Sequence, residues 1–99
     1  MLRAGDLTLD TRNGVLSCGA HSVRLSAREY QLMAFFMQNP GRILTRTHIS
    51  DGVWDDPSGI TDNAIEAQVK NLRKRIGTIS SRPWLQTRRG LGYVLEENP

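Results

Sequence analysis

The sequence predicts an α+β domain in which three helices stand between an N-terminal antiparallel sheet and a C-terminal β-hairpin. Three observations predict it: short segments with two-residue alternation before residue 26, capped segments with helical spacing in the middle, and a basic, glycine-containing turn near the end. The chain has 99 residues, enough for one domain and too few for two. We expect a single domain over 1–99, with strands over about 2–25, helices over about 27–38, 46–54 and 62–76, and a hairpin over about 84–96.

The N-terminal quarter has the alternation of short strands. Leu7–Asp10 alternates leucines with polar residues, and Val15–Cys18 and Ser22–Leu25 are further strand segments. Asn13-Gly14 is typical of a tight turn between two antiparallel strands. Because Cys18 has the same strand parity as Leu16, we expect a buried and unreactive thiol there.

The period changes from two to 3.6 residues after Leu25, where the first helix is expected. Ser26 and Glu29 match the S-x-x-E capping box, which satisfies free N–H groups at a helix start. Asn39-Pro40-Gly41 ends the segment. The expected core residues of this helix are Leu32, Met33, Phe35, Phe36 and Met37.

A shorter second helix is expected from Thr45, as its N-cap, to about Trp54. Ile49 and Val53 are one turn apart and should face the core. Gly52 counts against a helix here by roughly 1 kcal/mol relative to alanine. The loop 55–59 then separates this helix from the third.

The third helical segment has two contrasting faces. Thr61 or Asp62 can cap its start, and Gly77 is expected to close it at C′. The apolar face consists of Ile65, Val69, Leu72 and Ile76. The opposite face consists of Asn63, Ala67, Lys70 and Lys74, with Asn71 beside it. A small residue permits close approach, and amide and ammonium groups can donate to phosphates and base edges. This pattern predicts a recognition helix.

Charge is concentrated in the C-terminal third. The formal net charge is +3 overall, but residues 60–92 carry seven basic and two acidic side chains, net +5, against −2 for the remainder. Such a cluster favours a polyanionic partner, while a merely solvated basic face remains the alternative. The basic residues are Lys70, Arg73, Lys74, Arg75, Arg82, Arg88 and Arg89.

Several classes of protein are not indicated. A single cysteine excludes an intrachain disulfide, and His21 and His48 lack the spacing of metal ligands, so we expect neither a metal nor a cofactor. No nucleophile motif or phosphate-binding glycine loop is present, which argues against an enzyme. Without an apolar leader or a run of 18 apolar residues, we expect no membrane partner and a cytoplasmic location.

A helix, a short loop, a second helix and a basic hairpin follow one another in the order of a winged helix-turn-helix. The segments LSAREYQLMAFFMQNPGRILTR, NAIEAQVKNLRKRIG and LQTRRGLGY, with the pair Val53-Trp54, resemble the DNA-binding effector domain of OmpR/PhoB-type bacterial two-component response regulators. The resemblance covers about Leu7 to Leu95. Its most diagnostic parts are Leu72-Arg73-Lys74 and Thr87-x-Arg89-Gly90-x-Gly92-Tyr93.

The resemblance implies sequence-specific binding of double-stranded DNA and transcriptional regulation, with the third helix in the major groove and the hairpin turn, the wing, in the minor groove. It places recognition-helix contacts at Asn63, Ala67, Gln68, Lys70, Asn71, Arg73 and Lys74. It places wing contacts at Thr87, Arg88 and Arg89, and contacts with the DNA backbone at Trp54 and Arg46. It also implies that the loop with Asp55, Asp56 and Ser58 faces RNA polymerase.

Some assignments have open alternatives. Trp54 can be purely a core residue, and Arg73 can pair with Glu66 on nearly the same flank of the helix. Ala67 replaces a larger β-branched residue usual in the family, which can change the bases approached. Arg88 stands where an apolar residue is common, and its charge can bind the DNA backbone or pair locally.

The resemblance also implies partners outside this segment. Family members normally carry an N-terminal receiver domain that a sensor histidine kinase controls, and 99 residues leave no room for one. We therefore expect an excised effector domain, with a free-standing regulator as the alternative. The domain alone should be a monomer that forms a head-to-tail dimer on direct-repeat half-sites. A protein-interaction module without DNA binding is the alternative function.

Overall fold

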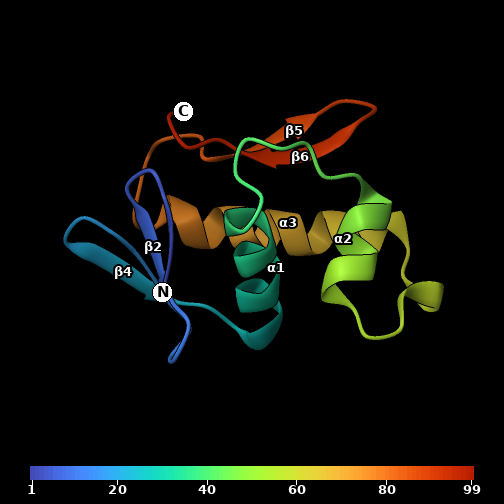
Figure 1. The fold of residues 1–99 in the computed structure, drawn as a ribbon, viewed down its shortest axis with the longest axis horizontal. Coiled ribbons are helices and arrows are strands. Elements are labelled where there is room, and N and C mark those ends of the chain that lie inside the picture. The colour runs from blue at the N-terminus through green and yellow to red at the C-terminus, as the bar shows by residue number, and fades with distance from the viewer.

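The N-terminal sheet and the C-terminal hairpin lie against different sides of a group of three helices (Figure 1). The computed structural model describes residues 1–99. Its strands are β1 Leu2–Ala4, β2 Leu7–Asp10, β3 Val15–Cys18, β4 His21–Arg24, β5 Leu85–Arg88 and β6 Gly92–Leu95. Its helices are α1 Ala27–Met37, α2 Arg46–Val53, a short 3₁₀ helix η1 Pro57–Gly59 and α3 Asp62–Gly77. This order confirms the predicted α+β arrangement.

The N-terminal sheet is an antiparallel meander in the order β1-β2-β3-β4. Its alternation is as predicted, because Leu7, Leu9 and Leu16 are fully buried against the helices. Cys18 differs from the prediction. It lies opposite His21 in the last pair of β3 and β4, beside the turn at residues 19–20, and is a free thiol that packs against the core but is only partly buried.

The start of α1 is the predicted capping box. The Ser26 hydroxyl accepts a hydrogen bond from the Glu29 N–H at 3.2 Å, and the Glu29 carboxylate accepts one from the Ser26 N–H at 2.8 Å. Leu32, Met33, Phe36 and Met37 are buried, as expected. Phe35 is only partly buried, and its ring packs against Gly52 of α2.

Gly52 has a packing reason that its helix propensity does not reveal. A Cβ atom at this position would lie 2.5 Å from the Phe35 ring, so only glycine lets α2 lie this close to α1.

The start of α2 also contains a second capping box. The Thr45 hydroxyl accepts from the His48 N–H at 3.1 Å, and His48 Nδ1 accepts from the Thr45 N–H at 3.3 Å. His48 therefore serves the helix start.

The two faces of α3 are as predicted, with Ile65, Val69, Leu72 and Ile76 all buried. The Thr61 hydroxyl caps the helix by accepting from the Ala64 N–H at 3.1 Å. The prediction that Gly77 closes the helix is wrong. Gly77 belongs to the last turn and Thr78 is the C-cap, where its hydroxyl donates to the Arg75 carbonyl at 2.6 Å and makes a left-handed glycine unnecessary.

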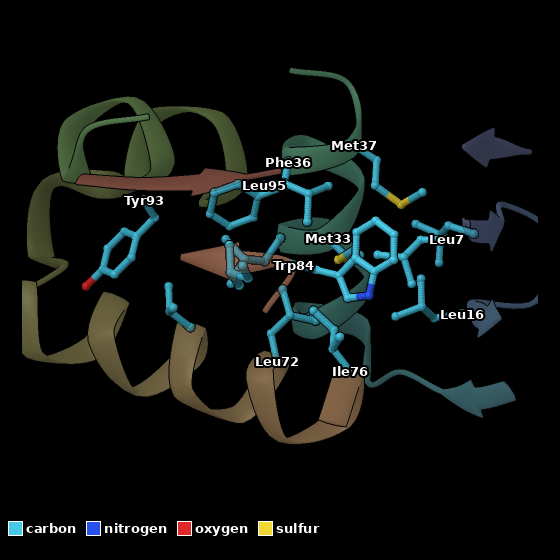
Figure 2. Packing of buried hydrophobic residues seen from close by; sticks show 14 of the residues in the cluster. Leu7, Leu16, Met33, Phe36, Met37, Leu72, Ile76, Trp84, Tyr93 and Leu95 are labelled. Carbon is cyan, nitrogen blue, oxygen red and sulfur yellow. The ribbon is translucent and has the colours of Figure 1, made fainter. Parts of the chain in front are cut away.

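The hairpin β5–β6 is held to the helices from both ends. Trp84, just before β5, is buried, and Figure 2 shows it among Leu7, Met33 and Ile76. Near the turn, Leu44 extends the hairpin by exchanging two backbone hydrogen bonds with Tyr93, at 2.8 and 2.9 Å. Gly92 makes this approach possible, because its φ is +146° and a Cβ there would collide with the Leu44 carbonyl. The wing is therefore anchored to the segment before α2.

Candidate nucleic-acid interface

The face of α3 opposite the core is open to solvent along its whole length. Asn63, Ala67, Lys70, Asn71 and Lys74 are all exposed, and Gln68 beside them is partly buried. Their side chains make no hydrogen bond or ion pair within the chain, whose four ion pairs all involve arginines. These amide and ammonium donors are therefore free for an external ligand. Ala67, at the centre, lets that ligand approach the helix backbone.

Arg73 is directed from α3 to the wing. Its Nε donates to the Leu85 carbonyl at 3.0 Å and its Nη2 to the Thr87 hydroxyl at 2.5 Å, while its guanidinium lies 5.9 Å from the Tyr93 ring centre. The alternative pairing with Glu66 is wrong, because Glu66 accepts from another arginine. The structure thus brings two predicted contact residues, Arg73 and Thr87, together with each other. Their contact fixes β5 against α3.

Arg46 is the partner of Glu66, with Nη2 and Oε1 3.1 Å apart. The hydrogen bond to Glu66 raises the pKa of Arg46 above its usual value. Its guanidinium lies 5.9 Å from the Tyr93 ring centre, and its buried Nε has no partner. Arg46 therefore joins the start of α2 to α3 and to the hairpin.

Two consecutive arginines of the wing, Arg88 and Arg89, differ in their contacts. Arg88, in β5, donates to the Gln86 side chain at 2.6 Å and to the Glu96 carboxylate at 2.8 Å, so it pairs locally. Arg89 begins the turn and is exposed without a partner in the chain. Gly90, with a φ of +73°, forms the turn, and Leu91 beyond it is 58% exposed.

Glu29 and Arg75 form an ion pair that sequence reasoning missed. Arg75 Nε is 3.3 Å from both carboxylate oxygens of Glu29, which is only 5% exposed. The two residues are 46 positions apart, so no local pattern could reveal the contact. They line a polar hollow together with Asn71, Lys74 and Thr78, which places the first turn of α1 beside the open face of α3.

Trp54, the C-cap of α2, is partly buried and packs against the core. Its indole N–H has no acceptor within the chain, so it combines an internal contact with a free donor. The guanidinium of Arg28 lies over its ring, 4.6 Å from the ring centre. Sequence reasoning gave Arg28 no role, because nothing near it in the sequence indicates the tryptophan.

The loop between α2 and α3 carries exposed acidic groups. Asp55 and Asp56 are exposed, and Asp56 caps η1 by accepting from the Ser58 hydroxyl at 2.6 Å and the Ser58 N–H at 3.2 Å. These two hydrogen bonds lower the pKa of Asp56. The loop therefore presents the Asp56 carboxylate in a fixed turn, with Asp55 exposed beside it. No cluster of His, Cys, Asp and Glu side chains could hold a metal ion, and no helix could cross a membrane.

Comparison with known proteins agrees with this geometry. Residues 20–95 match the family described as transcriptional regulatory protein, C terminal. The chain is 33% identical over 96 residues to the phosphate regulon transcriptional regulatory protein PhoB of Rhizobium meliloti, and 37% identical over 94 residues to the transcriptional regulatory protein TrcR of Mycobacterium tuberculosis. These matches cover 97% and 95% of this chain but 42% and 36% of the relatives, so the chain spans less than half of their length.

Solved structures have the same fold. The C-terminal domain of the nisin resistance regulator NsrR matches with a TM-score of 0.85 and 30% identity, over 100% of this chain and 99% of that chain. The DNA-binding domain of CpxR from E. coli matches with a TM-score of 0.78 and 27% identity, over 96% and 94%. The fold is therefore the winged helix predicted from the sequence. The chain belongs to the family of C-terminal DNA-binding domains of OmpR/PhoB-type response regulators, which are transcriptional regulators and not enzymes.

Proposed function

We propose that residues 1–99 act as a single DNA-binding domain that places α3 in the major groove and the β5–β6 turn in the adjacent minor groove. The observation that carries this proposal is the free face of α3. Its amide and ammonium groups have no partner in the chain, while the opposite face is fully buried. A helix about 10–12 Å wide fits the major groove, where base edges are exposed.

The side chains of this face divide into base readers and phosphate binders. Asn63, Gln68 and Asn71 carry amides, which can pair with adenine through two hydrogen bonds. Lys70 and Lys74 are unpaired ammonium groups suited to phosphate oxygens. Ala67 lets the backbone of α3 come close to the floor of the groove.

The wing contributes mainly through Arg89. It is the unpaired cation at the turn, and the narrow minor groove of A·T-rich DNA concentrates negative potential that attracts arginine. Thr87 is hydrogen-bonded to Arg73, and Arg88 to Glu96. Their main role is therefore to position the wing, and contact with DNA is secondary. Arg46 likewise connects α2 to α3 through Glu66, and its contact with the DNA backbone is secondary.

Titration of duplex DNA at several salt concentrations tests the proposal. Each phosphate neutralised by the protein adds about −0.9 to the slope of log affinity against log salt. With roughly four to six phosphates contacted, affinity should fall more than about a hundredfold between ~50 and ~200 mM salt. A flat response, or no binding to duplexes at low salt, would favour the protein-interaction module instead.

We further propose that the domain works in the cytoplasm as one half of a longer regulator with a receiver domain, under a sensor kinase. The free domain is then a monomer, and two copies bind direct-repeat half-sites about one helical turn, ~10–10.5 bp, apart. Dimerisation elsewhere in the full protein would raise occupancy through effective concentration. A stable dimer in sedimentation without DNA would contradict this, as would equal binding after the half-sites are moved apart by half a turn.

A second function, contact with RNA polymerase, is favoured by the loop between α2 and α3. Asp55 and Asp56 are exposed carboxylates without a cationic partner, and Asp56 is held at the start of η1 by its hydrogen bonds to Ser58. They suit a basic protein surface rather than DNA. Asp55→Asn should lower activated transcription in a reconstituted system and leave DNA affinity unchanged. Equal activation by the variant and the parent would remove this assignment.

A further inference from the structure

We propose that Arg28 extends the DNA-backbone contact expected at Trp54 into a two-residue phosphate-binding site at the junction of α1 and α2, outside both α3 and the wing. The inference rests on the DNA binding proposed above, and it names a contact residue, Arg28, to which no sequence pattern assigns a role. Four observations support it: the stacked geometry, the uncompensated charge, the number of free donors and the position beside α3.

The two side chains are held in one arrangement by contacts between distant parts of the chain. Arg28, in the first turn of α1, lies over the Trp54 ring at 4.6 Å from its centre. Its Nη1 donates to the Val53 carbonyl at 3.0 Å and to the Gln31 side-chain oxygen at 3.1 Å. Because these contacts already fix the guanidinium, a ligand would lose little side-chain entropy on binding it.

No carboxylate in the chain pairs with the positive charge of Arg28. Its partners are a carbonyl, an amide and an aromatic ring, and none of the four ion pairs in the chain includes it. A guanidinium has five N–H groups, of which the two on Nη1 are used. The N–H groups on Nε and Nη2, and the Trp54 indole N–H, have no acceptor in the chain. Such a group of donors around one cation matches the oxygens of a phosphate.

The junction lies next to the free face of α3. Glu29, the residue after Arg28, contacts Arg75 and lines the polar hollow with Asn71 and Lys74. The wing is joined to α3 on its other flank, through Arg73. The major groove is about 12 Å wide and bounded by the phosphates of both strands. A duplex on α3 would therefore present one strand to the wing side and the other to the α1–α2 junction.

Salt titration of five variants tests this proposal. Arg28→Gln should lower affinity roughly tenfold and reduce the salt slope by about 0.9, the loss of one phosphate contact. The same loss of slope should occur in the background of Trp54→Phe, which keeps the ring and removes the N–H donor. Arg28→Lys should retain the slope, because it keeps the charge. Arg3→Gln removes an equal charge from the exposed edge strand β1 and should leave the slope unchanged.

Two outcomes would overturn the proposal. If Arg28→Gln lowered affinity without changing the slope, and had no effect in the Trp54→Phe background, Arg28 would only position the tryptophan. If it lowered the melting temperature alone, Arg28 would only connect α1 to α2. Either result would leave the steep salt dependence of the parent intact, whereas failure of the proposed DNA binding would abolish that dependence in the parent itself.

Discussion

The basic side chains of α3 and the hairpin form two groups that differ in what they contact. Arg73, Arg75 and Arg88 each have partners inside the chain, on the hairpin, on α1 and across the hairpin. Lys70, Lys74 and Arg89 have none and are exposed. Both groups come from the same net-positive stretch of sequence. Local charge therefore indicates a polyanion partner without indicating which residues touch it.

The difference suggests that the paired arginines have a structural role and that the free cations bind phosphate. A planar guanidinium can make several hydrogen bonds at fixed angles, so arginine suits contacts that orient one element against another. A lysine ammonium is a point charge on a flexible stem and suits a phosphate whose position varies. In this domain the paired arginines hold the wing and α1 against the two flanks of α3, while the free cations between them remain available to DNA.

The largest expected effect is a loss of stability on removing the buried carboxylate of the Glu29–Arg75 ion pair. Glu29→Ala removes both the capping-box acceptor of Ser26 and the partner of Arg75 from a nearly buried site. We expect the free energy of unfolding to fall by about 2–3 kcal/mol, which lowers the melting temperature by roughly 10–20 °C in a domain of this size. Calorimetry or circular dichroism measures this.

Glu66→Ala is the matched control, because Glu66 also pairs with an arginine but is half exposed. Its loss of stability should be clearly smaller, since exposed ion pairs contribute little. If both substitutions lowered the melting temperature equally, the buried pair would not be the stronger structural contact that we describe.

Base reading should produce the next largest effect. Asn71→Ala should cost about 1–3 kcal/mol of binding free energy on the preferred site and relax the preference at one base pair. Lys74→Ala should weaken binding to all sequences nearly equally. A panel of single-base variants of the selected site separates the two results. Indistinguishable profiles for these variants would refute the assigned roles.

Uncoupling the wing from α3 should have a moderate effect. Arg73→Gln removes the hydrogen bonds to the Leu85 carbonyl and the Thr87 hydroxyl. We expect affinity to fall by about 1 kcal/mol and the preference for A·T-rich flanking sequence to weaken, because the wing loses its fixed position. The salt slope should stay near that of the parent. A slope reduced by about 0.9 would instead make Arg73 a direct phosphate contact.

The smallest expected effect is at Arg88, and its neighbour provides the contrast. Arg88→Gln breaks a partly exposed pair with Glu96, so unfolding free energy should change by less than about 1 kcal/mol and the salt slope should not change. Arg89→Gln should leave stability unchanged and lower both the slope and the A·T preference. If Arg88→Gln lowered the salt slope and Arg89→Gln did not, the wing would contact DNA through Arg88 instead.

The features that the sequence predicted correctly depend on residues within one or two turns of each other. The apolar and polar faces of α3 follow from 3.6-residue spacing, and the Ser26–Glu29 box is a contact between residues three apart. The features that it missed connect distant segments. The pairing of Arg28 with Val53 and of Arg75 with Glu29 spans 25 and 46 positions, and no periodicity records such a contact.

Glycine illustrates the same limit. Gly52 counts against a helix by propensity, yet it is required because Phe35 occupies the space of its Cβ. Gly77 resembles a helix terminator, yet Thr78 takes that role through its hydroxyl. In both cases a neighbour in space decides what the residue does.

The most direct test of the division between paired and free cations uses two consecutive residues of α3. Lys74 has no partner, and Arg75 is paired with Glu29. Salt titrations of Lys74→Gln and Arg75→Gln on one duplex compare the removal of one charge at each position. We predict that the slope of log affinity against log salt falls by about 0.9 for Lys74→Gln and is unchanged for Arg75→Gln, which instead lowers the melting temperature. Equal reductions of slope, or a reduction for Arg75→Gln alone, would contradict the division.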